Sequence, residues 1–163
     1  MERLWAPWRM EYVSSGADQS GGCFICAAAE SAELLAGSVD RDEHTVTLLN
    51  RFPYSSGHLM VCPRRHVPDI TAVSAVEGAA LFAGLQRALA ALNQALHPHA
   101  FNLGINQGPA AGGSVEDHLH IHVVPRWGGD TNFMPVVGQT KVLPELLSST
   151  AERLREAYAQ RKP

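Results

Sequence analysis

Three histidines, His118, His120 and His122, stand at alternate positions of the segment 118–124, and apolar residues fill its other positions. Strict alternation with β-branched residues predicts a β-strand. Because successive side chains of a strand point to opposite faces, we expect all three imidazoles on one face and the apolar side chains on the other, toward the core. Three groups that titrate near neutral pH gain no packing benefit from lying side by side, so the pattern indicates chemistry.

Other segments predict strands that pair with it. Residues 44–50 and 58–62 have strand composition and are joined by a turn that contains Pro53 and Gly57, so they predict an antiparallel pair. Residues 101–106 predict a further strand. A loop rich in glycine follows it and leads into the histidine segment.

Three helices are also expected. Ser74 and Glu77 form a capping box, and the leucines after them recur on one stripe until His97. A C-terminal helix is predicted over 143–161, with a proline in its first turn. A short alanine-rich helix follows the segment 23–26 and runs to about residue 35. Strand pairs with one long helix indicate the α+β class.

Length and charge exclude several classes of protein. The 163 residues predict a single domain over 1–163, with an N-terminal arm over 1–22. A net charge of −3 argues against a protein that coats nucleic acid or a membrane surface. No stretch approaches the roughly 20 apolar residues of a membrane span, and residues 1–10 lack the apolar core of a secretory signal. Three cysteines are an odd number for a disulfide framework, so we expect the reducing cytoplasm.

The three histidines leave three interpretations open. They could be chance residues on an exposed strand face, which strict alternation disfavours. They could bind a metal, but the first and last lie roughly 13 Å apart along a strand, so two could share an ion and three could not. The third interpretation is a histidine nucleophile with helpers, since imidazole attacks phosphorus well and leaves well. Gly112-Gly113-Ser114 favours this one, because glycine amides and a serine hydroxyl suit phosphate oxygens.

A second motif is the pair Cys23 and Cys26, separated by two residues. It could be a stray pair, a redox pair or half of a metal site. A redox pair normally opens a helix in a βαβ unit, which the expected strand order does not offer. A zinc site needs two further ligands, and His66 and His118 each lie at the end of an expected strand. The remaining cysteine, Cys62, is expected in the core.

These motifs resemble the histidine triad (HIT) superfamily of nucleotide hydrolases and transferases. The resemblance runs from about Arg3 to Leu147 and includes the stretch from Asn50 to Pro63, which is similar to the family's hairpin. That hairpin is most similar to the fragile-histidine-triad branch of dinucleoside polyphosphate hydrolases. Residues 4–9 and 112–130 resemble bacterial diadenosine tetraphosphate phosphorylases. The resemblance implies a HIT-like fold with about five antiparallel strands, one long helix and a C-terminal helix.

The resemblance also implies a role for each matching residue. His120 would attack the α-phosphorus and form a covalent nucleotidyl-histidine. His122 would bind a phosphate oxygen and assist the leaving group, and His58 would orient the cluster. Asn50 would bind the ribose hydroxyls, and the expected phosphate-binding residues are Gln107, Gly113 and Ser114.

In zinc-bearing relatives such as galactose-1-phosphate uridylyltransferase, similar positions hold a structural zinc. The resemblance therefore implies a zinc set of Cys23, Cys26, His66 and His118, although both close branches generally lack the cysteine pair. One triad histidine would then bind metal and two would remain for phosphorus. Mg²⁺ bound with the polyphosphate substrate is a second expected ion.

The expected function is cleavage of diadenosine polyphosphates at the α-phosphate, with water or inorganic phosphate as the acceptor. The expected partner is a second copy of the chain, joined edge to edge through the sheets as the family implies, which would also protect an exposed edge strand. Neither nucleic acid nor a membrane is an expected partner. Three alternatives stay open: a purine-nucleoside phosphoramidase, a non-catalytic nucleotide-binding protein, and a purely structural zinc module.

Overall fold

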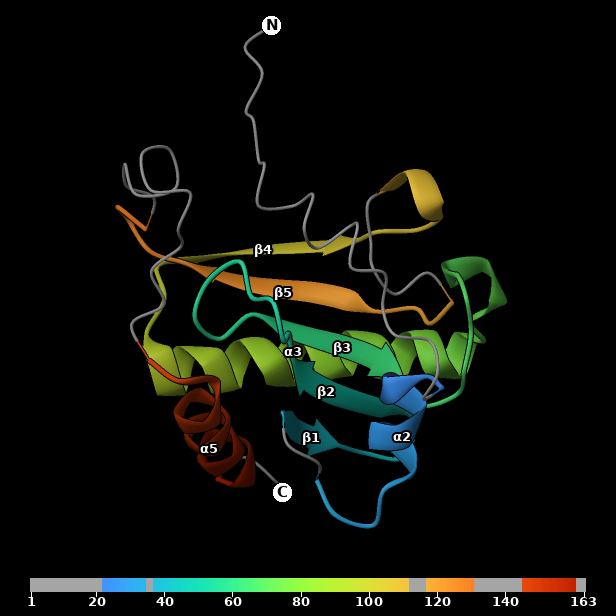
Figure 1. Ribbon diagram of the computed structural model, residues 1–163, viewed down its shortest axis with the longest axis horizontal. Coiled ribbons are helices and arrows are strands. Elements are labelled where there is room, and N and C mark those ends of the chain that lie inside the picture. The colour runs from blue at the N-terminus through green and yellow to red at the C-terminus, as the bar shows by residue number, and fades with distance from the viewer. Residues whose placement is uncertain (1–21, 35–36, 112–116, 131–144, 161–163) are drawn as a thin grey trace, which may run out of the picture.

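Five antiparallel strands form one sheet in the order β1-β2-β3-β5-β4 in the computed structural model, which describes residues 22–34, 37–111, 117–130 and 145–160 (Figure 1). The strands are β1 (Ser38–Arg41), β2 (Thr45–Leu49), β3 (Leu59–Pro63), β4 (Ala100–Ile105) and β5 (Ile121–Arg126). The helices are α2 (Phe24–Glu30), α3 (Ala75–Leu96) and α5 (Leu147–Ala159), with short 3₁₀ turns at Ile70–Ala72 and Pro109–Ala111. The α+β expectation is confirmed.

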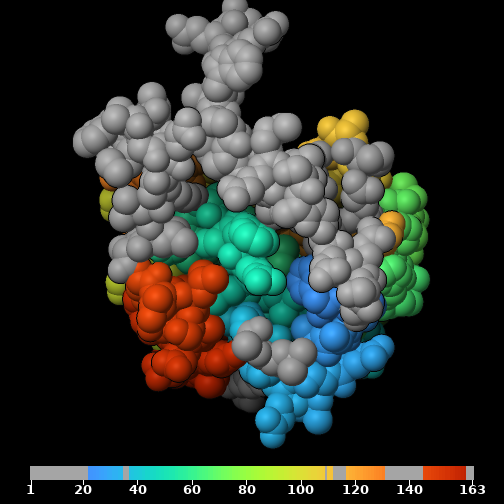
Figure 2. Space-filling view, in the orientation of Figure 1, coloured from blue at the N-terminus to red at the C-terminus, as the bar shows by residue number. Residues whose placement is uncertain are grey.

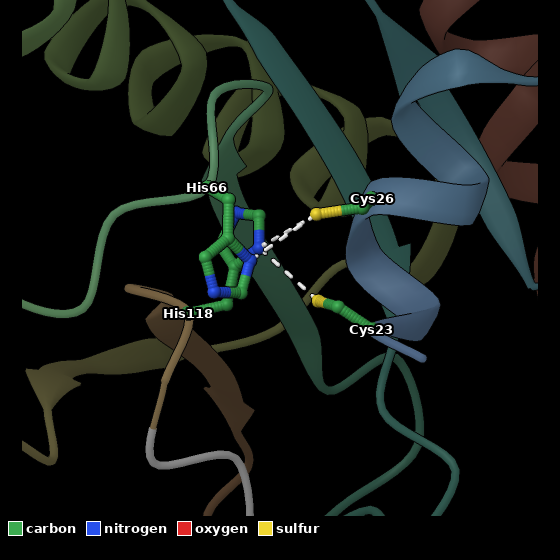
Figure 3. A group of neighbouring side chains, drawn as sticks. All are labelled: Cys23, Cys26, His66 and His118. Atoms are coloured by element: carbon green, nitrogen blue, oxygen red, sulfur yellow. Dashed lines mark hydrogen bonds between the residues drawn. The ribbon is translucent and has the colours of Figure 1, made fainter. Parts of the chain in front are cut away.

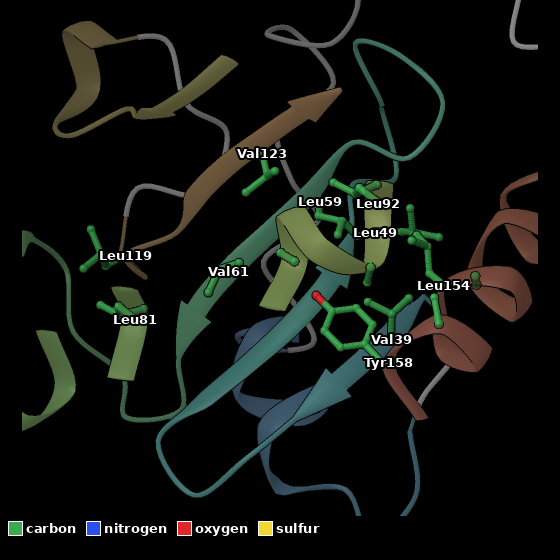
Figure 4. Close-up of a cluster of buried hydrophobic side chains, with 14 of the residues drawn as sticks. Val39, Leu49, Leu59, Val61, Leu81, Leu92, Leu119, Val123, Leu154 and Tyr158 are labelled. Carbon is green, nitrogen blue, oxygen red and sulfur yellow. The ribbon is translucent and has the colours of Figure 1, made fainter. Parts of the chain in front are cut away.

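One face of the sheet carries the main hydrophobic core. The long helix α3 lies behind the sheet in Figure 1, and α5 packs beside α3 and against β1. Leu59, Val61 and Val123 point from the strands toward Leu92 of α3 and Leu154 of α5 (Figure 4), and all five side chains are fully buried. Burying side chains of this size contributes roughly 1.5–3 kcal/mol each.

The opposite face is covered in part by the short helix α2. Ile25 and Ala28 of α2 pack on Val46 and Leu48 of β2 and on Met60 of β3, which forms a second, smaller apolar cluster. Strands β2 and β3 are therefore buried on both faces. The helix is held over this end of the sheet, and Cys23 at its N-cap and Cys26 in its first turn come with it.

The capping box at the start of α3 is confirmed. The Ser74 side chain accepts from the backbone N–H of Glu77, and the Glu77 carboxylate accepts from the backbone N–H of Ser74. Among the described residues, α3 is the one helix long and apolar enough to cross a membrane by length and composition alone. Its leucine stripe is explained by contact with the sheet and α5, where Leu81 and Leu92 are buried.

Gly57 makes the turn into β3 possible. Its φ of +77° lies in the left-handed region, and a Cβ atom there would come within 2.4 Å of Leu96 Cδ1 and 3.0 Å of Leu92 Cδ2. Any other residue would therefore be strained by its backbone and by contact with α3. The turn places the next residue, His58, in a fully buried position directly before β3.

Several expected boundaries need correction. Strand β5 begins at Ile121, not His118, because Leu119 donates its backbone N–H to Val67 O (2.7 Å) outside the ladder with β3. The short helix ends at Glu30 rather than near residue 35, and β1 was not located by the sequence. The C-terminal helix spans Leu147–Ala159, which is shorter than 143–161. The expected arm falls almost wholly on residues 1–21, outside the described residues, as does the expected proline of the first helical turn.

Candidate active site and metal centre

His58, which directly precedes β3, and His122 of β5 form a hydrogen-bonded pair, called the relay below. The backbone N–H of Tyr54 donates to Nδ1 of His58 (3.1 Å), so the proton of this fully buried imidazole is on Nε2. That Nε2 lies 3.0 Å from Nδ1 of His122 and donates to it. A neutral His122 therefore carries its own proton on Nε2. The register of the sheet permits this contact, because β3 and β5 pair Met60 with His122.

His120 is fixed in the opposite tautomer. Its Nδ1 lies 2.9 Å from the backbone carbonyl oxygen of His118, which can only accept, so Nδ1 carries the proton and Nε2 keeps a lone pair. The ring is 3% exposed and meets the His122 ring edge to face, with centroids 4.8 Å apart. A backbone carbonyl therefore holds this imidazole in place. The pair thus offers one nucleophilic nitrogen next to one N–H donor.

The surroundings of His122 predict a measurable titration. Burial, with a smaller contribution from nearby His120, lowers the pKa of His122 from 6.5 to about 4. The folded state therefore keeps His122 neutral between these values while the unfolded chain takes up a proton. We expect this group to reduce the free energy of unfolding as pH falls through that window. NMR titration of the His122 ring should give a midpoint near pH 4, and a midpoint near 6.5 would contradict the burial.

The first histidine of the motif belongs to a different cluster. Nδ1 of His118 lies 3.2 Å from Sγ of Cys23 and 3.5 Å from Sγ of Cys26, and Nδ1 of His66 lies 3.2 Å from Sγ of Cys26 (Figure 3). One ligand atom from each of the four residues falls within 4.8 Å of all the others. The three histidines therefore do not line one strand face as equals, because His118 precedes β5 and turns toward α2.

The donor set of this cluster suits a tetrahedral metal ion. His118 donates from Nε2 to the carbonyl oxygen of Pro63 (2.9 Å), which leaves the Nδ1 lone pair facing both sulfurs. Burial, then contact with Cys23, raises the pKa of Cys26 to about 11, so a bound cation would be needed to keep this sulfur a thiolate near neutral pH. Two thiolates and two imidazoles are typical zinc ligands, and corners of such a site are about 3.3–3.8 Å apart, given bonds of about 2.0–2.3 Å. The four residues can hold a metal ion.

Two of the predicted nucleotide-binding residues, Asn50 and Gln107, lie in the described part of the chain. Asn50 directly follows β2 beside the relay, where its backbone N–H donates to His58 O (2.8 Å) and its Oδ1 accepts from the N–H of Phe52 (2.8 Å). Gln107 directly follows Asn106, and its Oε1 accepts from the backbone N–H of Ile70 (3.1 Å). Gly113 and Ser114 lie outside the described residues.

Asn106 is a site residue that the sequence reasoning missed. Its Nδ2 lies 3.4 Å from Nε2 of His122. The signal was available in the strand pattern, because β4 pairs Gly104 with His122 and a residue two positions on faces the same side.

A five-stranded antiparallel sheet that carries paired, tautomer-fixed histidines is the arrangement expected of a histidine triad protein. The HIT domain family model matches residues 32–129, and the chain belongs to the HIT family. It is 37% identical to AP-4-A phosphorylase of Mycobacterium tuberculosis over 98% of this chain and 86% of that protein. It is 39% identical to the bifunctional bis(5'-adenosyl)-triphosphatase/adenylylsulfatase FHIT of Arabidopsis thaliana, over 51% of this chain and 46% of that protein.

The crystal structure of a Zn-bound histidine triad family protein from Mycobacterium smegmatis has a similar fold. It superposes with a TM-score of 0.69 at 31% identity, and covers 85% of this chain and 94% of that one.

Proposed function

We propose that this protein is an enzyme that cleaves diadenosine polyphosphates at the α-phosphate, with His120 as the nucleophile and water or inorganic phosphate as the acceptor. The observation that carries the proposal is the 2.9 Å contact between Nδ1 of His120 and the His118 carbonyl, which leaves Nε2 with a lone pair available to attack phosphorus. The names of the relatives, AP-4-A phosphorylase and bis(5'-adenosyl)-triphosphatase, support this class of substrate.

The reaction divides into two displacements at phosphorus. In the first, Nε2 of His120 bonds to the α-phosphorus while the bond from phosphorus to the bridging oxygen breaks, and its electron pair leaves with the polyphosphate. In the second, an oxygen of water or phosphate attacks the same phosphorus, and the electrons of the N–P bond return to Nε2. The His118 carbonyl keeps accepting from Nδ1 throughout and stabilises the positive charge on the imidazole of the intermediate.

Negative charge on the phosphate oxygens requires donors already in place. Nε2–H of His122 and the amide of Asn106 lie 3.4 Å apart and can converge on one acceptor, which suits a non-bridging or leaving oxygen. Gly113 and Ser114 remain proposed phosphate ligands, and Asn50 remains a proposed ligand of the ribose. Gln107 remains a proposed phosphate ligand, because its Oε1 accepts from the Ile70 N–H while its amide N–H groups are still donors, and we add Asn106 to it.

We propose that the Cys-His cluster holds a structural zinc ion. The chemistry of the four donors and the zinc-bound relative from Mycobacterium smegmatis support this. When bound, the ion would lock α2, the segment at His66 and the segment at His118 together. The described residues give no support to Mg²⁺, because their single cluster of three or more possible ligands contains sulfur and imidazole rather than carboxylates.

We further propose a cytoplasmic homodimer paired through β4. Free thiols at Cys23, Cys26 and Cys62 suit a reducing compartment. Strand β4 is at an end of the sheet, and most of its residues are exposed. Leu103 on this strand is 50% exposed, which is a feature of surfaces that pair. Light scattering should give a particle of about twice the 17.6 kDa chain mass.

Product analysis tests the proposed reaction. Purified protein is incubated with diadenosine tetraphosphate, with and without inorganic phosphate, and an adenosine phosphoramidate is offered separately. ADP and ATP formed only with phosphate identify a phosphorylase, whereas AMP and ATP formed without it identify a hydrolase. Cleavage of the phosphoramidate alone would replace the proposal with the phosphoramidase alternative. Binding without turnover of either compound would make the chain a nucleotide-binding protein.

A further inference from the structure

The segment 50–57 between β2 and β3 places an aromatic ring on the buried relay. The Tyr54 ring stacks on His58, with centroids 4.8 Å apart and 19° between the planes. It also lies 6.2 Å from the His122 ring. Figure 2 shows that this segment, between α2 (blue) and α5 (red), reaches the molecular surface, where 49% of Tyr54 is exposed. The proposed reaction uses the His58 and His122 imidazoles, and it gives no role to the Tyr54 ring.

The position of the segment is itself constrained. The Ser55 hydroxyl donates to the carbonyl oxygen of Pro125 on β5 (2.7 Å), and Gly57 packs against α3 at the other end. Both fixed points follow Tyr54 within three residues, so they hold its backbone close to β5 and α3. This matters because its backbone N–H donates to His58 Nδ1 while its ring covers the same imidazole.

The orientation of the His58 ring determines what His122 can do. The torsion that turns an imidazole about its Cβ–Cγ bond is broad, so a single hydrogen bond at Nδ1 fixes the tautomer better than the plane. Tilting the ring would move its Nε2–H away from His122 Nδ1, which it now meets at 3.0 Å. His122 could then take the other tautomer and present a lone pair, rather than an N–H, to a phosphate oxygen.

We infer that Tyr54 is a positioning residue of the active site, whose ring fixes the plane of His58 and thereby keeps the N–H of His122 directed toward the substrate. The stacked ring confines His58 from one side, which the backbone N–H alone cannot do. This role rests on the proposed function for its effect on catalysis, although the orientation of the two histidines can be measured without substrate.

Three substitutions of Tyr54 distinguish the effect of its aromatic ring from the effect of its side-chain volume. Tyr54→Phe keeps the stack, Tyr54→Leu fills much of the space without an aromatic plane, and Tyr54→Ala removes both. We expect Tyr54→Phe to keep kcat within about twofold, and Tyr54→Leu and Tyr54→Ala to lower kcat by about tenfold or more with KM changed less than about twofold. Thermal unfolding of each variant shows whether it still folds. If Tyr54→Ala does not fold, kcat is compared between Tyr54→Phe and Tyr54→Leu.

The second measurement is ¹⁵N NMR of the histidine side chains in the absence of substrate. Wild type and Tyr54→Phe should show His122 with its proton on Nε2 alone, whereas Tyr54→Leu should show a mixture of the two tautomers. The matched control is Phe52→Leu, an exposed aromatic of the same segment whose ring stacks against the Arg51 guanidinium, and its spectrum should match the wild type.

Unchanged His122 tautomers and kcat in Tyr54→Leu would overturn the inference, as would a Tyr54→Phe variant as impaired as Tyr54→Leu. If the wild-type protein fails to cleave dinucleotides, the proposed function falls while the NMR comparison still decides the role of Tyr54.

Discussion

Replacing His120 with glycine is expected to lower kcat by at least about 10³-fold and to abolish covalent labelling of the protein. The substitution removes Nε2 of His120, the proposed nucleophile, whose lone pair is left available by the bond from Nδ1 to the His118 carbonyl. The remaining donors at Asn106 and His122 still bind a phosphate, so KM should change much less than kcat. The measurement is turnover of diadenosine tetraphosphate, together with trapping of α-³²P-labelled nucleotide on the denatured chain.

The trapped label should be stable in base and released in acid, as a phosphoramidate is. His44→Gly is the matched control, because it removes a histidine from the turn between β1 and β2, away from the relay. We expect it to label and turn over like the wild type. Label retained by the His120→Gly protein would refute the nucleophile assignment, and label lost from both variants would point to a general loss of structure.

The second large effect is expected from the Cys-His cluster. Cys26→Ser should lower the metal content from about one zinc per chain to near zero, because a hydroxyl is a poor replacement for a thiolate ligand. Without the ion, the link between α2, His66 and His118 is lost. We expect a loss of several kcal/mol of stability, and a melting temperature lower by about 10 °C. Elemental analysis and calorimetry measure the two quantities.

Cys62 supplies a matched control for that substitution. Its side chain is fully buried among Val46, Met60 and Ile25, and it is absent from the four-residue cluster. Cys62→Ala should therefore keep one zinc per chain, and should cost only the stability of a small buried side chain, about 1 kcal/mol. A Cys26→Ser protein that retains zinc and melts with the wild type would rule out the structural metal.

Local patterns were sufficient for much of the fold. The capping box at Ser74 and Glu77, and the leucine stripe after it, depend on side chains within a few residues of one another, so the sequence predicted α3 closely. Strand β1 was missed for the opposite reason. It has four residues, and two of them are charged. Asp40 is nevertheless buried, because it pairs with Arg87 (3.2 Å) from α3, 47 residues away. No pattern in the residues next to Asp40 predicts its pairing with Arg87.

The site shows the same division between local and distant information. The alternation of histidines indicated chemistry, and the cysteine spacing left a metal site among its interpretations. The place of Asn106 beside His122 depends on the pairing of β4 with β5, which a shift of one residue would reverse. The start of β5 at Ile121 depends on the backbone bond from Leu119 to Val67 O and on His118 contacts with cysteines more than 90 residues away. Contacts between segments distant in the sequence decided both.

His118 has a consequence for any attempt to redesign this protein. Its imidazole faces the two cysteines, while its backbone carbonyl holds His120. A metal-free version could not be made by replacing the four ligands with apolar residues alone, because the same peptide unit would lose its anchor and the nucleophile its orientation. A designer would first need another way to immobilise that carbonyl, such as a new hydrogen bond to Pro63 O or tighter packing around Leu119. In this protein, a change to the metal ligands is therefore also a change to the orientation of His120, and the two have to be designed together.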